Sequence, residues 1–195
     1  MLQNIQRRSS RIGSAILVLL VLPGLGIGLG CRNSAHPAEN EGPESLKLAS
    51  PGLPDKQFPA SFTCNGADTS PALVWSAPPP NTQSLALILN DRDAPLGSFV
   101  HWVLFNIPET TRSLAEAVPT QGQLADGSRQ GRNEFGNLGY GGPCPPGHRR
   151  HRYVFLLFAL DTKLNLPAGA TRNDVENAMN GHVLARGTLT ATFSR

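Results

Sequence analysis

The chain has 195 residues, with 17 Lys and Arg against 14 Asp and Glu, which gives a formal net charge of +3. That excess lies in residues 1–30, which contain Arg7, Arg8 and Arg11 and no acidic residue, so residues 31–195 carry no net charge. A neutral remainder without a long Lys/Arg run, a zinc-ribbon cysteine pattern or a P-loop argues against nucleic-acid-binding and nucleotide-binding proteins.

Residues 1–30 have the organisation of a bacterial export signal. The apolar stretch Ile12–Leu22 follows a positive start and is too short to cross a membrane as a helix. Cys31 follows the small residue Gly30, as in a lipoprotein lipobox, where the cysteine is lipidated and begins the mature protein. We therefore predict a signal peptide over 1–30, lipidation of Cys31 and anchoring in the bacterial cell envelope or periplasm. An ordinary secretory signal, or an uncleaved anchor over Ile12–Leu29, is the alternative.

Residues 31–45 are polar and have no apolar periodicity, which predicts a flexible tether. Residues 46–195 then form one domain, long enough for its own core.

The elements predicted within this domain are mostly strands. Three runs are apolar on both faces, as in central strands that are covered on both sides. They are Ser84–Asn90, Phe99–Asn106 and Tyr153–Leu160. By contrast, Thr188–Ser194 alternates apolar and polar residues, which predicts a strand with one wet face. Shorter candidate strands are Leu46–Ala49 and Ala72–Trp75.

One helix is predicted, over Asn173–Asn180, with Thr171 as N-cap and Asp174 three residues later. The segment 110–146 is rich in Gly, Asn and Pro and is too long for a plain connection. A loop of that length in a compact domain is usually functional.

Polar residues on the apolar strands are the candidates for chemistry. Asp91 and Asp93 end the first central strand, and His101 lies within the next, on the face that alternation assigns to Phe99, Val103 and Phe105.

A Gly- and Pro-rich turn, Gly141–Gly147, leads to His151 and Tyr153, which are two residues apart and so share a face. Imidazoles, a phenol and backbone N–H groups freed by glycines suit a small anion, particularly a phosphate.

Each of these residues also has a purely structural interpretation. Asp91 and Asp93 are common turn residues, His101 fits a hydrogen-bonded core histidine, and Tyr153 fits core packing with a satisfied hydroxyl. No H-E-x-x-H or H-x-H spacing is present, so we expect no zinc site.

Taken together, the motifs resemble the phosphatidylethanolamine-binding protein family, which includes the Raf kinase inhibitor proteins, and are most similar to its bacterial and archaeal branch. The similarity runs from about residue 46 to 195. The matching segments are Phe62–Gly66, Ser70–Trp75, Asp91–Pro95, His101–Pro108, Asn133–Tyr140, Gly142–Gly147, His151–Tyr153 and Gly181–Ala185.

The resemblance implies a mainly β fold: a large central antiparallel sheet packed with a smaller second sheet and a few short peripheral helices. It also implies an anion pocket at one edge of the main sheet. Carried over by position, the ligand-binding residues are Asp91, Asp93, His101, Gly142, His151 and Tyr153. Arg92 stands where the family usually has Pro and adds a charge beside the pocket.

Cys64 and Cys144 remain once Cys31 is assigned to the lipid. In an exported protein this pair can form a disulfide that links an early loop to the pocket turn. Two reduced, buried thiols are the alternative.

The sequence favours a membrane-tethered binding module, without cofactor or catalytic residue, that holds a phosphate-bearing head group or another small anion. It would sense or carry that ligand, or inhibit or regulate a partner enzyme, with no nucleic-acid partner. A second hypothesis is a phosphoester hydrolase that uses Asp91, His101 and His151 as acid–base groups. A third is an inhibitor of a kinase or protease that acts by protein contact alone.

Overall fold

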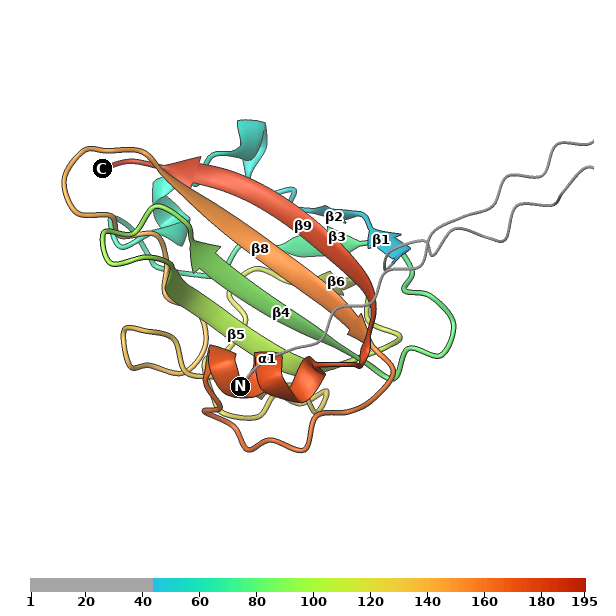
Figure 1. Ribbon diagram of the computed structural model, residues 1–195. Coiled ribbons are helices and arrows are strands. Elements are labelled where there is room, and N and C mark those ends of the chain that lie inside the picture. The colour runs from blue at the N-terminus through green and yellow to red at the C-terminus, as the bar shows by residue number, and fades with distance from the viewer. Residues whose placement is uncertain (1–43) are drawn as a thin grey trace, which may run out of the picture. The chain divides into compact units, whose positions relative to one another are not determined.

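The computed structural model describes residues 44–195, so the predicted signal peptide, Cys31 and nearly all of the tether lie outside the described residues. A six-stranded sheet has the order β1-β9-β8-β4-β5-β7, and a three-stranded sheet has the order β2-β3-β6 (Figure 1). The large sheet consists of β1 (Glu44–Leu46), β4 (Ser84–Asp91), β5 (Phe99–Pro108), β7 (Arg129–Gln130), β8 (His151–Leu160) and β9 (Val183–Phe193). The small sheet consists of β2 (Leu48–Ala49), β3 (Leu73–Trp75) and β6 (Ser113–Leu114).

The predicted mainly β architecture is confirmed, with one difference in strand direction. Every neighbouring pair in the large sheet is antiparallel except β1 and β9, which run parallel, so the sheet is mixed. Leu46 pairs with Gly187 there, and a Cβ on Gly187 would lie 2.8 Å from the Leu46 carbonyl oxygen. Strands so distant in the chain are not joined by a hairpin, and their relative direction leaves no local pattern in the sequence.

The three predicted central strands are the long strands β4, β5 and β8. Every residue of β4 is buried, as its apolar residues on both faces predicted. The alternating strand β9 also forms, and its Thr188 and Thr190 side chains are exposed as expected. It begins at Val183, five residues before the predicted start.

Two apolar clusters cover the two faces of the large sheet. One lies between the two sheets and includes Leu73 and Trp75 of β3 together with Leu87 of β4. The other lies beneath α1 (Arg172–Met179), whose buried residues are Val175 and Met179. The long strands are therefore buried on both sides.

The predicted N-cap, Thr171, is confirmed, and the helix begins at Arg172, one residue before the predicted start. The Thr171 Oγ1 accepts a hydrogen bond from the Asp174 N–H at 3.3 Å, and the Asp174 carboxylate accepts one from the Thr171 N–H at 2.8 Å. This reciprocal cap satisfies backbone donors that the first turn leaves open. Two short 3-10 helices, Pro54–Lys56 and Ala60–Phe62, complete the helical elements of the described region. None of its helices combines the length and the apolar character needed to span a bilayer.

Candidate functional site

The candidate residues meet where β4 ends, β5 begins and β8 begins. In the sheet register, Asp91 is paired with Phe99 of β5 on one side and with Tyr153 of β8 on the other. Residues paired across neighbouring strands project to the same face. Three segments that are distant in the sequence thus place their side chains on one patch.

A β-bulge brings His101 to this patch. Leu89 pairs with Trp102 and Asn90 pairs with Val100, so His101 is the extra residue between them. Its ring centroid lies 5.2 Å from those of both Phe99 and Tyr153. The bulge bends the strand and redirects this side chain.

The face predicted for His101 was therefore partly wrong. Phe99 shares its surroundings, but Val103 and Phe105 belong to the cluster beneath α1, on the opposite face of the sheet. Strict alternation fails because the extra residue shifts the next side chains to the other face, until a second irregularity before Ile107 restores the original face.

His151 and Asp91 form a buried pair. The His151 Nδ1 lies 2.7 Å from the Asp91 Oδ2, and the two side chains are only 3% and 5% exposed. The second oxygen of Asp91 accepts a hydrogen bond from the Asp93 N–H at 2.8 Å. Because a carboxylate oxygen accepts, the His151 Nδ1 donates, and this fixes the orientation of the ring.

His101 is also held through its Nδ1, which donates to the Gly141 carbonyl oxygen at 2.7 Å. This leaves Nε2 as the ring nitrogen that is available to a ligand. Burial lowers the pKa of His101 below its usual value of 6.5, although the Gly141 carbonyl opposes that shift. The neutral ring therefore presents an acceptor at Nε2 near neutral pH.

Tyr153 has a buried hydroxyl with no hydrogen-bond partner within residues 44–195. Burial, and then the negative charge of Asp91, raise its pKa, so the hydroxyl remains a donor. An unpaired buried hydroxyl costs about 1–3 kcal/mol unless water or a ligand bonds to it.

A small cavity opens against these residues. Its volume is about 140 Å³, well below the 300 Å³ or more that is usual for pockets holding drug-sized molecules. Its walls are Asp91, Ala94, Pro95, Phe99, His101, Phe135, Cys144, Pro145 and Pro146. Asp91 and His101 are the ionisable groups of this wall, whereas His151 and Tyr153 lie outside the lining set and contact it through Asp91 and the His101 ring.

Asp93 is engaged away from this cavity. Its carboxylate accepts the Arg152 Nε–H at 2.9 Å, the Arg152 Nη2–H at 2.7 Å and the Arg152 backbone N–H at 2.8 Å. These bonds hold the pKa of Asp93 well below its usual range. The arrangement anchors the turn after β4 to the start of β8.

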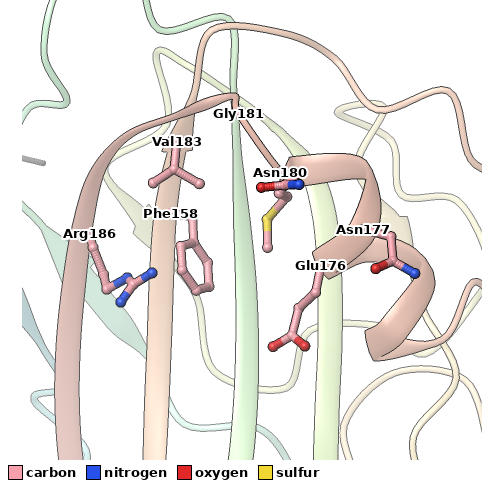
Figure 2. Close-up of a pocket in the computed structure, with 8 residues that line it drawn as sticks. Phe158, Glu176, Asn177, Asn180, Gly181, Val183 and Arg186 are labelled. Carbon is pink, nitrogen blue, oxygen red and sulfur yellow. The ribbon is translucent and has the colours of Figure 1, made fainter. Parts of the chain in front are cut away.

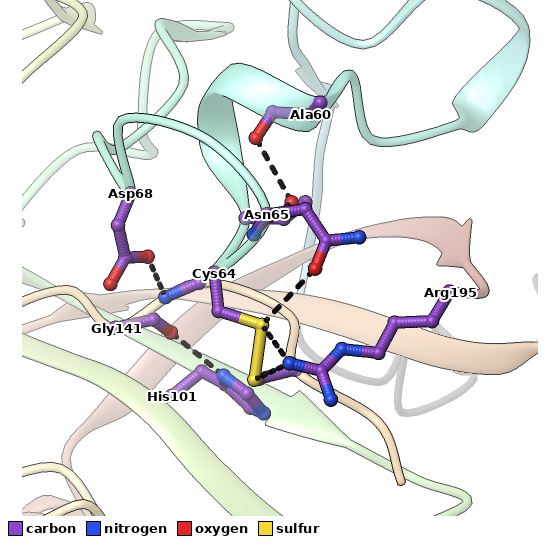
Figure 3. The surroundings of a disulfide bond; sticks show 10 residues. Ala60, Cys64, Asn65, Asp68, His101, Gly141 and Arg195 are labelled. Atoms are coloured by element: carbon purple, nitrogen blue, oxygen red, sulfur yellow. Dashed lines mark hydrogen bonds between the residues drawn. A yellow bond between two sulfur atoms is a disulfide. The ribbon is translucent and has the colours of Figure 1, made fainter. Parts of the chain in front are cut away.

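Gly142 is likewise engaged. Its N–H donates to the Asp68 Oδ1 at 2.6 Å (Figure 3), and a Cβ here would overlap the Phe62 carbonyl oxygen. The need for glycine at this position is therefore steric. An anion can use this N–H only in exchange for the Asp68 carboxylate.

A disulfide joins Cys64 to Cys144, with their Cα atoms 5.4 Å apart. The Arg195 Nη2 lies 3.2 Å from each sulfur, as Figure 3 shows. Cys144 and Phe135 also line a second cavity of about 250 Å³, on whose wall Asp68 lies. The disulfide and the Phe135 ring thus form part of the walls of both cavities.

A wider depression of about 500 Å³ lies at the end of α1 (Figure 2). The Arg186 guanidinium lies 5.1 Å from the centroid of the Phe158 ring, and Glu176 is paired with Arg172 at 2.8 Å. These charged groups already have partners, and no buried unpaired polar group lines the depression. It is a weaker candidate than the small cavity. Within residues 44–195, no group of three His, Cys, Asp or Glu side chains could hold a metal ion.

Sequence reasoning assigned no role to Asp68 or Phe135. The available signal was the cysteine pairing: Asp68 lies four residues after Cys64, so a bond to Cys144 brings it close to Gly142. Phe135 lies in the long segment predicted to be functional, whose second half supplies much of the cavity wall.

Comparisons with known proteins agree with this architecture. Residues 50–194 match the family model described as Phosphatidylethanolamine-binding protein. A UPF0098 protein of Pyrococcus abyssi is 42% identical over 183 residues, which are 92% of this chain and 96% of the relative. One from Methanothermobacter thermautotrophicus is 50% identical over 139 residues, 71% of this chain and 91% of the relative.

Two solved structures are similar as well. A Chlamydia trachomatis protein, described as a putative phosphatidylethanolamine-binding protein homolog, aligns with a TM-score of 0.70 and 33% identity, covering 78% of this chain and 99% of its own. Escherichia coli YbcL is described as a new member of the mammalian PEBP family. It aligns with a TM-score of 0.71 and 31% identity, covering 77% of this chain and 99% of its own.

Proposed function

Because the chain belongs to the phosphatidylethanolamine-binding protein family, we propose that it is a binding module whose small cavity holds a phosphate-bearing head group or a similar small anion. The observation that carries the proposal is the open Nε2 of His101 in the cavity wall, next to Asp91 and with the buried Tyr153 ring packed behind it. The volume of about 140 Å³ suits one compact polar group and excludes an acyl chain.

The groups that line the cavity determine which protonation state of phosphate binds. The Asp91 carboxylate and the neutral His101 Nε2 both accept hydrogen bonds, and both repel a fully deprotonated phosphate. We therefore propose that the bound phosphate carries a proton, or that His101 takes one up on binding. In both cases binding takes up a proton from solution. The phosphate affinity therefore falls as the pH rises, because the proton concentration falls.

The proposed setting follows from the N-terminal sequence. A signal peptide over 1–30 and lipidation at Cys31 would export the domain and anchor it in the cell envelope. There, occupancy of the cavity would report or carry the anion, or control a partner enzyme such as a kinase or protease.

Calorimetric titration tests the binding proposal directly, with inorganic phosphate and with phosphoethanolamine. His101→Asn is the informative variant, because the Asn amide keeps a donor at the position of Nδ1 for the Gly141 carbonyl and removes Nε2. We expect its phosphate affinity to fall about ten- to hundredfold, the loss of one charge-assisted hydrogen bond. His182→Asn, in an exposed pair remote from the cavity, is the matched control and should bind normally.

Titrations in buffers of different ionisation enthalpy give the number of protons taken up. The absence of any phosphate binding by the unsubstituted protein would refute the proposal, as would equal binding by His101→Asn.

The hydrogen-bonded Asp91–His151 pair favours one second candidate, a phosphoester hydrolase, since a carboxylate that orients an imidazole is a common acid–base arrangement. Turnover of p-nitrophenyl phosphate that is lost in His101→Asn would support it. Saturable phosphate binding without turnover supports the binding module instead.

A further inference from the structure

One peptide group of the cavity turn is hydrogen-bonded at both ends. Its carbonyl oxygen, from Gly141, accepts the His101 Nδ1–H at 2.7 Å, and its N–H, from Gly142, donates to the Asp68 Oδ1 at 2.6 Å (Figure 3). The C=O and N–H of a peptide bond share delocalised electrons. The Asp68 carboxylate and the His101 ring are therefore connected through this group, although no hydrogen bond joins them directly within residues 44–195.

The local backbone is suited to this contact. Asp68 has a φ of 56°, in the left-handed region that Asp and Asn adopt more readily than most residues with a side chain. At Gly142 an added Cβ would lie 2.5 Å from the same Asp68 oxygen, so the close approach requires glycine. The disulfide from Cys64 to Cys144 joins the two loops that carry these residues. The fold thus brings a carboxylate to this particular N–H.

The connection matters most when the ring is protonated. A carboxylate that accepts the Gly142 N–H polarises the peptide group and makes the Gly141 oxygen a better acceptor. An imidazolium gains more from that oxygen than a neutral ring does, because its Nδ1–H carries part of the charge. Burial lowers the pKa of His101, and the Gly141 carbonyl and the charges of Asp91 and Asp68 oppose that shift. The ring is only 2% exposed, so these groups replace water as the partners of a proton.

We propose that Asp68 is a positioning residue for His101, which acts through the Gly141–Gly142 peptide group to orient the ring and to strengthen the binding of a proton at Nε2. The arrangement resembles the direct Asp91–His151 pair, with a peptide group inserted between carboxylate and imidazole. The inference deepens the proposed function. It rests on that function only for its consequence, that Asp68 sets the pH range in which an anion is bound.

Other titratable groups also face His101 from neighbouring elements. They are Asp91 of β4, His151 and Tyr153 of β8, Tyr140 of the loop before the cavity turn, and Arg195 at the disulfide. Burial raises the pKa of both phenols, so both remain neutral. Within the described part of the chain, Asp68 is the carboxylate that reaches the ring through a hydrogen-bonded peptide group.

Histidine titration by NMR on the ligand-free full chain tests the proposal, with His101→Asn to identify the resonance. Asp68→Asn removes the charge, keeps an acceptor for the Gly142 N–H and suits the same backbone conformation. Glu134→Gln is the matched control. The Glu134 Oε2 also accepts a backbone N–H at 2.6 Å, that of Val100 beside His101, but this peptide group does not bond to the ring.

We expect Asp68→Asn to weaken the proton affinity of His101 by at least about threefold, because a neutral acceptor polarises the peptide group less than a charged one. The His101 Nδ1–H resonance should move upfield as its bond to Gly141 weakens. Glu134→Gln should change both readings far less. An unchanged His101 titration in Asp68→Asn, or an equal change in Glu134→Gln, would overturn the proposal, since an Asp68 with a purely structural role keeps its bond as asparagine.

The unsubstituted chain gives a second measurement that needs no variant. As His101 takes up its proton, its stronger bond to the Gly141 oxygen should polarise the same peptide group and move the Gly142 amide proton downfield. A Gly142 amide proton that does not respond would overturn the proposal even if Asp68→Asn fails to fold.

The two proposals fail separately. If the anion site takes its proton on His101, Asp68→Asn should lower the pH at which phosphate affinity begins to fall. A shifted His101 titration in a protein that binds no phosphate would retain the role of Asp68 and refute the proposed function. Phosphate binding with an unshifted His101 titration would do the reverse.

Discussion

β8 has a histidine–aspartate pair at each end, and the two pairs differ most in burial. At the start of the strand, His151 lies 2.7 Å from Asp91, and the side chains are 3% and 5% exposed. Just past its end, His182 lies 2.7 Å from Asp161, and the side chains are 47% and 42% exposed. The same two residue types at the same distance thus occupy opposite solvent environments.

The comparison shows that two pairs with the same distance can contribute differently to stability. An exposed pair contributes at most about 1 kcal/mol, because water solvates both groups whether or not they meet. A buried pair costs several kcal/mol in lost hydration and is stable only while both partners are present. The pair at the cavity end lowers stability through lost hydration, as expected where function requires polar groups in a core.

Removing one partner from each pair is the strongest test of the comparison. His151→Ala leaves the Asp91 carboxylate buried and unpaired, so we expect the free energy of unfolding to fall by about 3–5 kcal/mol. His182→Ala at the exposed end should cost less than about 1 kcal/mol. Urea unfolding of both variants measures the difference. Similar losses in the two would show that burial does not distinguish the pairs.

The pH dependence of stability sharpens the comparison at the buried end. Burial lowers the pKa of His101 in the folded protein below the unfolded value of 6.5, so the unfolded chain binds more protons in acid. The stability that the neutral ring contributes is present above pH 6.5 and is lost as the pH falls towards the folded pKa, by up to about 1.4 kcal/mol per pH unit. His101→Asn should lack this loss in urea unfolding between pH 5 and 7. An unchanged pH slope would contradict the assignment to His101.

The smallest expected effect comes from removing the unpaired Tyr153 hydroxyl. Tyr153→Phe removes a buried donor that has no partner within the described residues, so we expect the free energy of unfolding to rise by about 1 kcal/mol. Phosphate affinity should fall less than it does in His101→Asn, because Tyr153 lies behind the cavity wall and not in it. Thermal unfolding and calorimetry measure the two changes. A loss of stability would show that the hydroxyl already has a structural role.

Much of the fold was accessible from the sequence because it depends on local patterns. Apolar runs predicted β4, β5 and β8, and the Thr171 cap predicted the start of α1. These signals depend on side-chain period and capping, which act over a few residues. The position of His151 and Tyr153 on one face followed from the same alternation.

The parts that alternation missed depend on contacts distant in the sequence. The bulge at His101 appears only when β4 and β5 are paired, and it places Val103 on the other face of the sheet. The bond from the Gly142 N–H to Asp68 joins residues 74 positions apart. Neither contact leaves a periodic signal in either segment.

The disulfide between Cys64 and Cys144 has a consequence for how the protein is made. The two cysteines are 80 residues apart, so Cys64 leaves the ribosome well before Cys144, which lies in the cavity wall. Closing a loop of that length removes roughly 4 kcal/mol of conformational freedom from the unfolded chain in the entropic model. The cavity wall at Cys144 is therefore tied to the early loop by an oxidation step that is separate from translation and depends on the redox state of the compartment.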